Sequence, residues 1–205
     1  MWYKLGITLC VFIGLMTACV PAPGVQGYFK RGYTAYTKEN YTAAFKDFRY
    51  LAELNHGQSQ YYLAQMYANG EGVPQDVYES SRWHFRAAEN GVLESQHTLG
   101  MMYQFGSSVA RDLSEAASWF TEAANAGYRP SQLKMAEIFS DNSSPAYDPV
   151  MAYMWYTIFM EREMGQTRAD VLNSRQVLMN AMSSNEIQTG EHLARTWQTP
   201  TLPDR

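Results

Sequence analysis

The sequence of 205 residues predicts an all-α fold, a right-handed α/α solenoid of stacked helix pairs with about ten helices. The first observation behind this prediction is a repeat at a fixed offset of 36 residues, which relates the segments that begin at Ser59, Ser95 and Ser131. The second is that apolar residues recur at helical spacing inside each copy. The third is that glycine and aspartate recur where helices would end and begin. Units with such a period cannot bury their apolar faces alone, so they stack.

Residues 1–18 have the pattern of a secretory signal peptide. Lys4 is followed by an uncharged apolar run over residues 5–15. At ~1.5 Å per residue this run is too short to cross a bilayer core of ~30 Å. A positive start, a short apolar centre and then small residues are typical of a leader that is removed.

The next residues, Met16 to Cys19, resemble a bacterial lipobox, which implies that Cys19 is lipidated and anchors the mature chain. The resemblance further implies a Gram-negative envelope protein that faces the periplasm. Val20, in place of an aspartate that would favour the inner membrane, indicates the outer membrane. Residues 19–27 contain two prolines and predict an extended tether. An ordinary signal peptide with a chance cysteine remains the alternative.

Each of the three copies begins with a predicted helix that ends at a residue suited to left-handed backbone. In the first copy, Leu63 and Met66 fall on one helical stripe. Gly70 then stands where a positive φ is needed, and Gly106 repeats that position. The third copy has Asn142 there, the residue that most often replaces glycine in this conformation.

The second helix of each copy is predicted to begin at an aspartate. Asp76, Asp112 and Asp148 can accept hydrogen bonds from the exposed N–H groups of the first turn, and Glu79 and Glu115 can reach back in the first two copies. We interpret these aspartates as N-caps rather than as catalytic residues or calcium ligands. A tryptophan follows in every copy, and its recurrence at a structural period makes it a core residue rather than a ligand-stacking platform. The three positions are Trp83, Trp119 and Trp155.

These motifs resemble the Sel-one-like repeats, relatives of the tetratricopeptide repeats. From Leu63 to Gly91 the chain follows the family pattern nearly throughout, with Leu-Ala, Met-Tyr, Gly-x-Gly-Val, Asp, Trp and Ala-Ala in turn. Departures lie in the loops, where Ser108 replaces a glycine and Pro145 a valine. The resemblance implies three repeats, over residues 59–94, 95–130 and 131–166.

Weaker patterns flank these repeats. Residues 28–58 contain the stretch NYTAAFKDF and resemble a degenerate tetratricopeptide repeat. Residues 167–198 carry an apolar stripe and a capping-box pattern from Ser183 to Glu186, which predicts C-terminal helices that cap the stack. The tail, residues 199–205, contains two prolines and is expected to fray.

Composition and spacing argue against several classes of function. The net charge of −4, without any basic run, disfavours a nucleic-acid partner. The four histidines lack the spacing of metal ligands, and His84 stands at the seam position that Phe120 and Tyr156 occupy in the other copies. No phosphate-binding loop or nucleophile elbow is present. We therefore expect no metal, no cofactor, no catalytic residue and no enzymatic activity.

The resemblance implies a lipid-anchored periplasmic scaffold or adaptor that binds proteins and aids the assembly or regulation of a cell-envelope complex. Its partners would be envelope proteins, and its membrane contact would be the lipid. Two alternatives remain open. One is an enzyme or binding protein that acts on peptidoglycan fragments, and the other is a structural spacer.

In tetratricopeptide-like stacks the first helix of each pair lines the partner-binding surface. The outward positions of these helices differ between copies, as expected of a recognition surface and equally of an unconstrained one. Aromatic or apolar members would anchor a partner, and charged members would orient it. The first predicted row is Tyr62, Thr98 and Lys134, and the second is Gln65, Met101 and Glu137.

Overall fold

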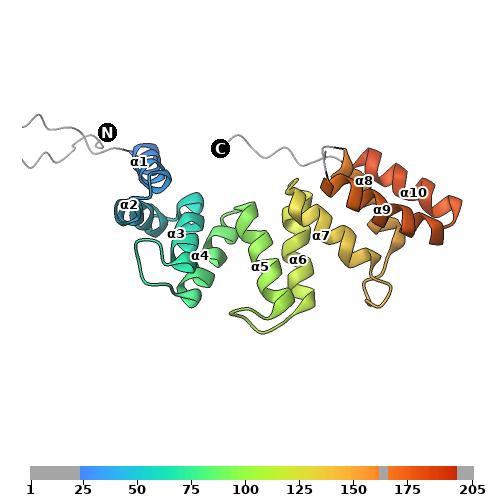
Figure 1. Cartoon of the computed structure of the whole chain (residues 1–205), viewed down its shortest axis with the longest axis horizontal. Helices are drawn as coiled ribbons and strands as arrows, with labels where there is room; N and C mark the ends of the chain where they lie inside the picture. Colours follow the sequence, from blue (N-terminus) through green and yellow to red (C-terminus); the bar gives the residue numbers. More distant parts are fainter. Residues whose placement is uncertain (1–23, 162–165, 198–205) are drawn as a thin grey trace, which may run out of the picture.

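The computed structural model describes residues 24–161 and 166–197, and every regular element within these ranges is a helix (Figure 1). The all-α prediction is therefore confirmed for the described residues. The helices are α1 (Val25–Thr37), α2 (Tyr41–Glu53), α3 (Gly57–Asn69), α4 (Val77–Glu89), α5 (Leu93–Phe105), α6 (Leu113–Asn125), α7 (Arg129–Ser140), α8 (Pro149–Met160), α9 (Gln166–Ala181) and α10 (Ser184–Thr196).

The helices stack in chain order, with α1 at one end and α9 and α10 at the other (Figure 1). From α1 to α8 each helix packs against its neighbours in sequence, most extensively within the pairs α1–α2, α3–α4, α5–α6 and α7–α8. Buried apolar residues accordingly form several clusters along the stack instead of one central core. This arrangement is the solenoid that the 36-residue period predicts.

Helix α1 begins at Val25, three residues before the predicted boundary at residue 28. Residues 25–27 were predicted to belong to an extended tether and are helical instead. The reason is local. No proline interrupts residues 24–37, and the carbonyl of Gly24 accepts a hydrogen bond from the amide of Tyr28 at 3.0 Å. The signal peptide at 1–18, Cys19, the first part of the tether and the tail at 199–205 lie outside the described residues.

The ends of the first helices follow prediction in two repeats out of the three. Gly70 and Gly106 have φ values of +72° and +70°, and Ser108 keeps the second loop in the shape of the first at φ +64°. The prediction for Asn142 was wrong, since its φ is not positive. Helix α7 ends instead at an extended Asp141, whose Oδ1 accepts hydrogen bonds from the amide and hydroxyl of Ser143 at 2.9 and 2.6 Å. A side-chain turn thus replaces the left-handed residue.

The second helices begin as predicted. Asp76, Asp112 and Asp148 each accept two hydrogen bonds from first-turn amides at distances between 2.9 and 3.1 Å. The reciprocal bond from a glutamate was predicted in the first two copies, and the described contacts place Glu79 beside Arg82 instead. A complete capping box does form at α10, from Ser183 to Glu186.

The tryptophan ladder is buried at both ends and half-exposed in the middle. Trp83 and Trp155 retain 9% and 3% of their accessible surface, as expected of core residues. Trp119 is only half-buried, and the prediction that it is a core residue was too strong. In this central repeat the fully buried ring is that of the next residue, Phe120.

Phe120 fills its position because the helix opposite carries no side chain there. A Cβ atom added at Gly100 in α5 would lie 2.5 Å from Cε1 of the Phe120 ring. The equivalent residues of the other repeats are Ala64 and Ala136, and His84 and Tyr156 stand at the position of Phe120. The central helices α5 and α6 therefore meet at a small residue that the phenylalanine ring requires.

The C-terminal end departs from the pairwise pattern. Both α9 and α10 pack against α8, and α10 does so more extensively than α9. Nearly all of α8 is buried, and the ring of Trp155 lies 5.8 Å from that of Trp197, in an edge-on arrangement. Among the described helices, none combines the length and the apolar character required to cross a bilayer.

Candidate partner-binding surface

The first predicted row begins at Tyr62, which has a packing role. Its ring is stacked on that of Phe48, with centroids 4.8 Å apart and planes inclined by 10°. The rings of Phe29, Tyr33 and Tyr36 lie between 5.5 and 6.0 Å away. Tyr62 is half-buried in this cluster, so a polar substitution would disturb α1 and α2 as well as any bound partner.

The other apolar anchor of the predicted rows, Met101, packs against the largest buried cluster. Thr98 is half-buried, and its hydroxyl donates a hydrogen bond to the carbonyl of Glu94 at 2.8 Å. Gln65 is half-buried as well. These three side chains lie on α3 and α5, and no described hydrogen bond joins them to each other.

Lys134 and Glu137 are the predicted residues that the structure brings together. They form an ion pair of 2.6 Å on α7, with 22% and 48% of their side-chain surfaces exposed. Both line a hollow of about 770 Å³ between α5, α6 and the loop that follows α7. Phe105 and Leu113, which are 66% and 53% exposed, contribute its apolar part.

Sequence reasoning missed a second set of side chains on the first helices. Tyr61 on α3, Glu94 on α5 and Tyr128 at the start of α7 lie within electrostatic range of one another. We call these three residues the tyrosine–glutamate cluster. The ring of His97 lies 5.5 Å from that of Tyr128 and extends the same surface. The cluster therefore joins the first helices of three successive repeats.

The electrostatics of this cluster suit hydrogen bonding to a partner. Burial, and secondly the charge of Glu94, raises the pKa of Tyr61 and of Tyr128, so both hydroxyls stay protonated and can donate. Burial, and secondly the charge of Lys134, lowers the pKa of His97, which favours the neutral ring. His97 Nδ1 lies 2.9 Å from Ser131 Oγ. The hydroxyls and the Glu94 carboxylate make no hydrogen bond within the described part of the chain.

The repeat offset contained a signal for this surface. Tyr61, His97 and Leu133 are separated by 36 residues and form the row next to the predicted one. Glu94 precedes His97 by three positions and so shares its side of α5. Tyr128 is harder to find from sequence, because the residues at the same N-cap position of α5 and α3 are Val92 and His56, so the tyrosine itself does not recur.

The histidine predicted to lie in the seam does so. His84 is 2% exposed, and its Nδ1 lies 3.1 Å from Ser95 Oγ. Burial lowers the pKa of His84 to about 4. Over residues 24–161 and 166–197, no group of three or more histidine, cysteine, aspartate or glutamate side chains is arranged to hold a metal ion.

Comparison with known proteins connects this geometry to a family. The family model of the Sel1 repeat matches residues 57–92, 93–128 and 130–158. Its units begin two residues before the boundaries predicted at 59 and 95, because they start with the first helix of each pair. Sel1 repeats form protein-interaction scaffolds.

Curated relatives match about a third of this chain. An exopolysaccharide production negative regulator of Rhizobium leguminosarum bv. viciae is 41% identical over 64 residues, which are 31% of this chain and 24% of the relative. A protein of the same description in Rhizobium meliloti (strain 1021) is 36% identical over 69 residues, which are 34% of this chain and 26% of the relative. The chain thus spans about a quarter of the length of these relatives.

Solved structures agree on the fold. A Sel1 repeat protein from Oxalobacter formigenes is similar with a TM-score of 0.63 and 22% identity, over 70% of this chain and 59% of that one. A protective antigen present in uropathogenic Escherichia coli strains, which displays an SLR fold, is similar with a TM-score of 0.52 and 21% identity. That match covers 85% of this chain and 45% of the antigen. With three matched repeats and a helical stack shared with both solved structures, this chain is a Sel1-repeat protein.

Proposed function

We propose that this protein is a lipid-anchored scaffold of the bacterial cell envelope that holds a partner protein on the first helices of its repeats. The observation that carries the proposal is the tyrosine–glutamate cluster, in which three successive repeats each contribute a polar group that has no described hydrogen-bond partner. Half-buried polar groups without an intramolecular hydrogen bond can bond to a ligand that replaces their water.

The chemistry of the cluster indicates what the partner presents. The carboxylate of Glu94 accepts hydrogen bonds and favours a lysine or arginine side chain. The hydroxyls of Tyr61 and Tyr128 flank it and can donate to backbone carbonyls. The neighbouring half-buried rings of Tyr62 and His97 supply apolar contact area. We propose that an extended segment of the partner, with one basic residue, lies across α3, α5 and α7.

The first prediction concerns this surface. The triple variant Tyr61→Phe, Glu94→Gln, Tyr128→Phe keeps every side-chain shape and removes two hydroxyls and one charge. We expect partner capture to weaken by about tenfold or more, because hydrogen bonds to charged groups contribute roughly 1.5–3 kcal/mol each. Quantitative mass spectrometry of proteins crosslinked to the variant and the wild type in envelope extracts measures the change.

A matched control is available on the second helices. Tyr78, which is 74% exposed on α4, and Glu115 on α6 lie outside the cluster, so Tyr78→Phe with Glu115→Gln should capture the same proteins as the wild type. Both variants should keep the wild-type circular dichroism and melting temperature. Equal capture by the triple variant and the wild type would reject this surface.

The second prediction concerns the anchor, which falls on residues outside the described ranges. Its support is the apolar run at 5–15 and the lipobox resemblance at Cys19. Cys19→Ser should abolish labelling by radioactive palmitate and release the protein from the membrane fraction, since acyl chains contribute ~0.8 kcal/mol per buried methylene. In density gradients the wild type should sediment with outer membranes. Unchanged membrane partitioning of Cys19→Ser would refute the anchor.

A narrower function is suggested by the curated relatives, which are described as negative regulators of exopolysaccharide production. The match covers about a third of this chain, so a partner-binding surface shared with these relatives would be the inherited part. The captured proteins decide between the two forms of the proposal. A partner from polysaccharide synthesis supports a regulator, and a structural envelope complex supports an assembly scaffold.

A further inference from the structure

Positive charge is concentrated at one end of this stack. Residues 24–56 contain five lysine and arginine residues against three acidic residues, whereas residues 57–205 contain ten against seventeen. The lysines are more uneven still. Of the five in the chain, Lys30 and Lys46 lie in α1 and α2, Lys38 is the C-cap of α1, and Lys134 is the only one after them. A mildly acidic protein therefore has one basic end.

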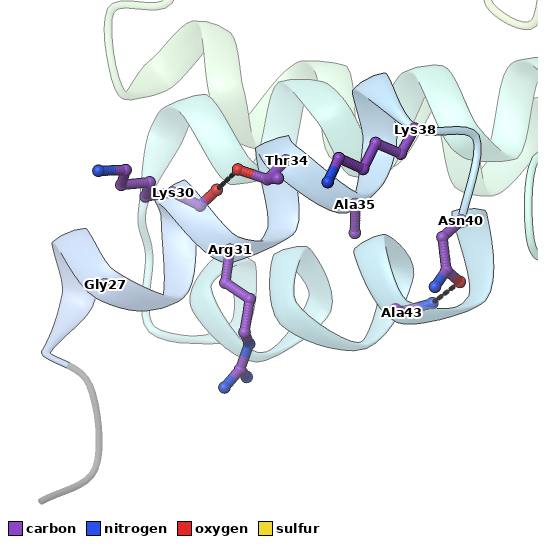
Figure 2. A pocket seen from close by; sticks show the side chains of 8 residues that line it. All are labelled: Gly27, Lys30, Arg31, Thr34, Ala35, Lys38, Asn40 and Ala43. Carbon is purple, nitrogen blue, oxygen red and sulfur yellow. Dashed lines mark hydrogen bonds between the residues drawn. The ribbon is translucent and has the colours of Figure 1, made fainter.

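The basic end coincides with a side of the fold that no later helix covers extensively, over residues 24–161 and 166–197. Helix α1 is the first described helix, and α2 is the only helix against which it packs extensively. A shallow hollow of about 730 Å³ lies along its outer side, where Lys30, Thr34 and Lys38 recur at helical spacing. Figure 2 shows these side chains along α1, with Asn40 and Ala43 at the start of α2.

We call Lys30 and Thr34 of α1, Lys38 at its C-cap, and Ala43 and Lys46 of α2 the basic end face. Lys46 belongs to it because it follows Ala43 by three positions on the same side of α2. Lys30, Lys38 and Ala43 line the hollow, and the lysines and Ala43 are exposed.

The three lysines of this face are available to an external anion. The neighbouring arginines are already paired, Arg31 with the buried Asp47 at 2.5 and 2.6 Å, and Arg49 with Glu53 at 2.9 Å. In the described part of the chain the ammonium groups of Lys30, Lys38 and Lys46 have no ion-pair partner. Tyr50 is 48% exposed on α2 and adds an aromatic ring of the kind enriched at membrane interfaces.

The sequence before α1 identifies what lies opposite this face. Val25 lies six positions after Cys19, a distance of at most ~20 Å when fully extended. Any attachment of the chain to a bilayer through Cys19 or the apolar run at 5–15 holds the basic end face close to lipid headgroups. Lysines near an anionic bilayer surface are each attracted to it, roughly fivefold per residue.

We infer that the basic end face docks on anionic phospholipid headgroups and that the stack projects from the membrane with α1 nearest the bilayer. The inference takes the anchor of the proposed function as its starting point, and the docking face is its own claim. Three lysines alone bind weakly, so their effect is to orient a protein that the lipid already holds at the surface.

The test uses the full lipidated protein, purified from membranes and reconstituted into vesicles of phosphatidylcholine alone or mixed with phosphatidylglycerol. Acylation of each lysine by a water-soluble reagent is followed by mass spectrometry. We expect Lys30, Lys38 and Lys46 to react about threefold more slowly on the anionic vesicles at low salt and equally on both at 1 M salt, where the Debye length is ~3 Å. Lys134 on α7 is the internal reference and should react alike on both.

Two double variants distinguish an effect of positive charge from an effect of the lysine side chain itself. The protection of Lys46 from acylation is measured in each. Lys30→Glu with Lys38→Glu should abolish the protection of Lys46, whereas Lys30→Arg with Lys38→Arg should preserve it. Arg195→Glu, at the far end of the stack on α10, should leave it unchanged.

Two outcomes overturn the docking face. They are equal lysine reactivity on neutral and anionic vesicles with which the protein floats, and protection that appears without lipid and rises with protein concentration. The last outcome would assign the face to a second copy of the chain. Flotation with neutral vesicles reports the anchor by itself, so loss of the anchor and failure of the docking face are distinguished in one experiment.

Discussion

Trp155→Ala should lower the free energy of unfolding by about 3–5 kcal/mol, the usual cost of truncating a buried tryptophan. Trp155 is 3% exposed and belongs to the largest buried cluster. It lies on α8, which packs against α7, α9 and α10. Its ring also packs edge-on against Trp197. A loss of this size is a large share of the ~5–15 kcal/mol typical of a folded domain. Urea titration followed by circular dichroism measures it.

The equivalent residue in the next repeat is a built-in comparison. Trp119 is half-buried, so Trp119→Ala should cost clearly less than Trp155→Ala, about 1–2 kcal/mol. Trp155→Phe keeps an aromatic ring and removes an indole N–H that is buried without a hydrogen-bond partner, so it should cost less than the alanine variant. Equal losses for Trp119→Ala and Trp155→Ala would mean that the ladder is buried uniformly, against the structure.

The second large effect is destabilisation by acid. Burial lowers the pKa of His84 from 6.5 to about 4, so the folded state resists protonation of a group that the unfolded state protonates readily. The free energy of unfolding therefore carries no penalty from His84 above pH 6.5, and it falls as the pH decreases toward 4. The loss approaches roughly 3 kcal/mol at the acidic end, at 1.36 kcal/mol per pKa unit. Burial lowers the pKa of His56 and His97 too, and both act in the same direction.

His84→Phe tests this assignment, since phenylalanine is the natural residue at the same position of the next repeat, Phe120. The variant cannot be protonated, so its stability should change less between pH 7 and pH 4 than that of the wild type. It also leaves Ser95 Oγ without its partner, which lowers stability at every pH without changing the slope. Identical pH profiles of unfolding free energy for the two proteins would show that His84 does not carry the effect.

Features that a short segment decides could be predicted from the sequence. Asp76 and its copies cap helices because an aspartate accepts from the amides just after it, and no distant residue is needed. The left-handed ends at Gly70 and Gly106 are local in the same sense. The prediction for Asn142 was wrong because two ways of ending the helix competed there, a left-handed residue and a side-chain turn. The turn made by the adjacent Asp141 is the one that forms.

Features that depend on contacts between distant segments were harder to predict. Tyr62 shares its repeat position with Thr98 and Lys134, which suggested a variable surface. Its burial comes from Phe29 and Phe48, in a helix pair that lies before the matched repeats. The tyrosine–glutamate cluster requires three helices to converge, and only the offset from Tyr61 to His97 gave a hint of it.

The way α10 packs against α8 also limits how copies of this protein can associate. In the repeats, the helix that follows each pair covers the exposed side of its second helix, as α5 covers α4 and α7 covers α6. At the C-terminal end α10 already covers α8, and a Cβ atom at Gly190 would lie 2.8 Å from Cδ1 of Tyr153. A neighbouring molecule cannot place its α1 there to continue the superhelix. The head-to-tail contact in which α1 of one molecule packs against α8 of the next, as successive helix pairs pack within the chain, is therefore excluded by α10.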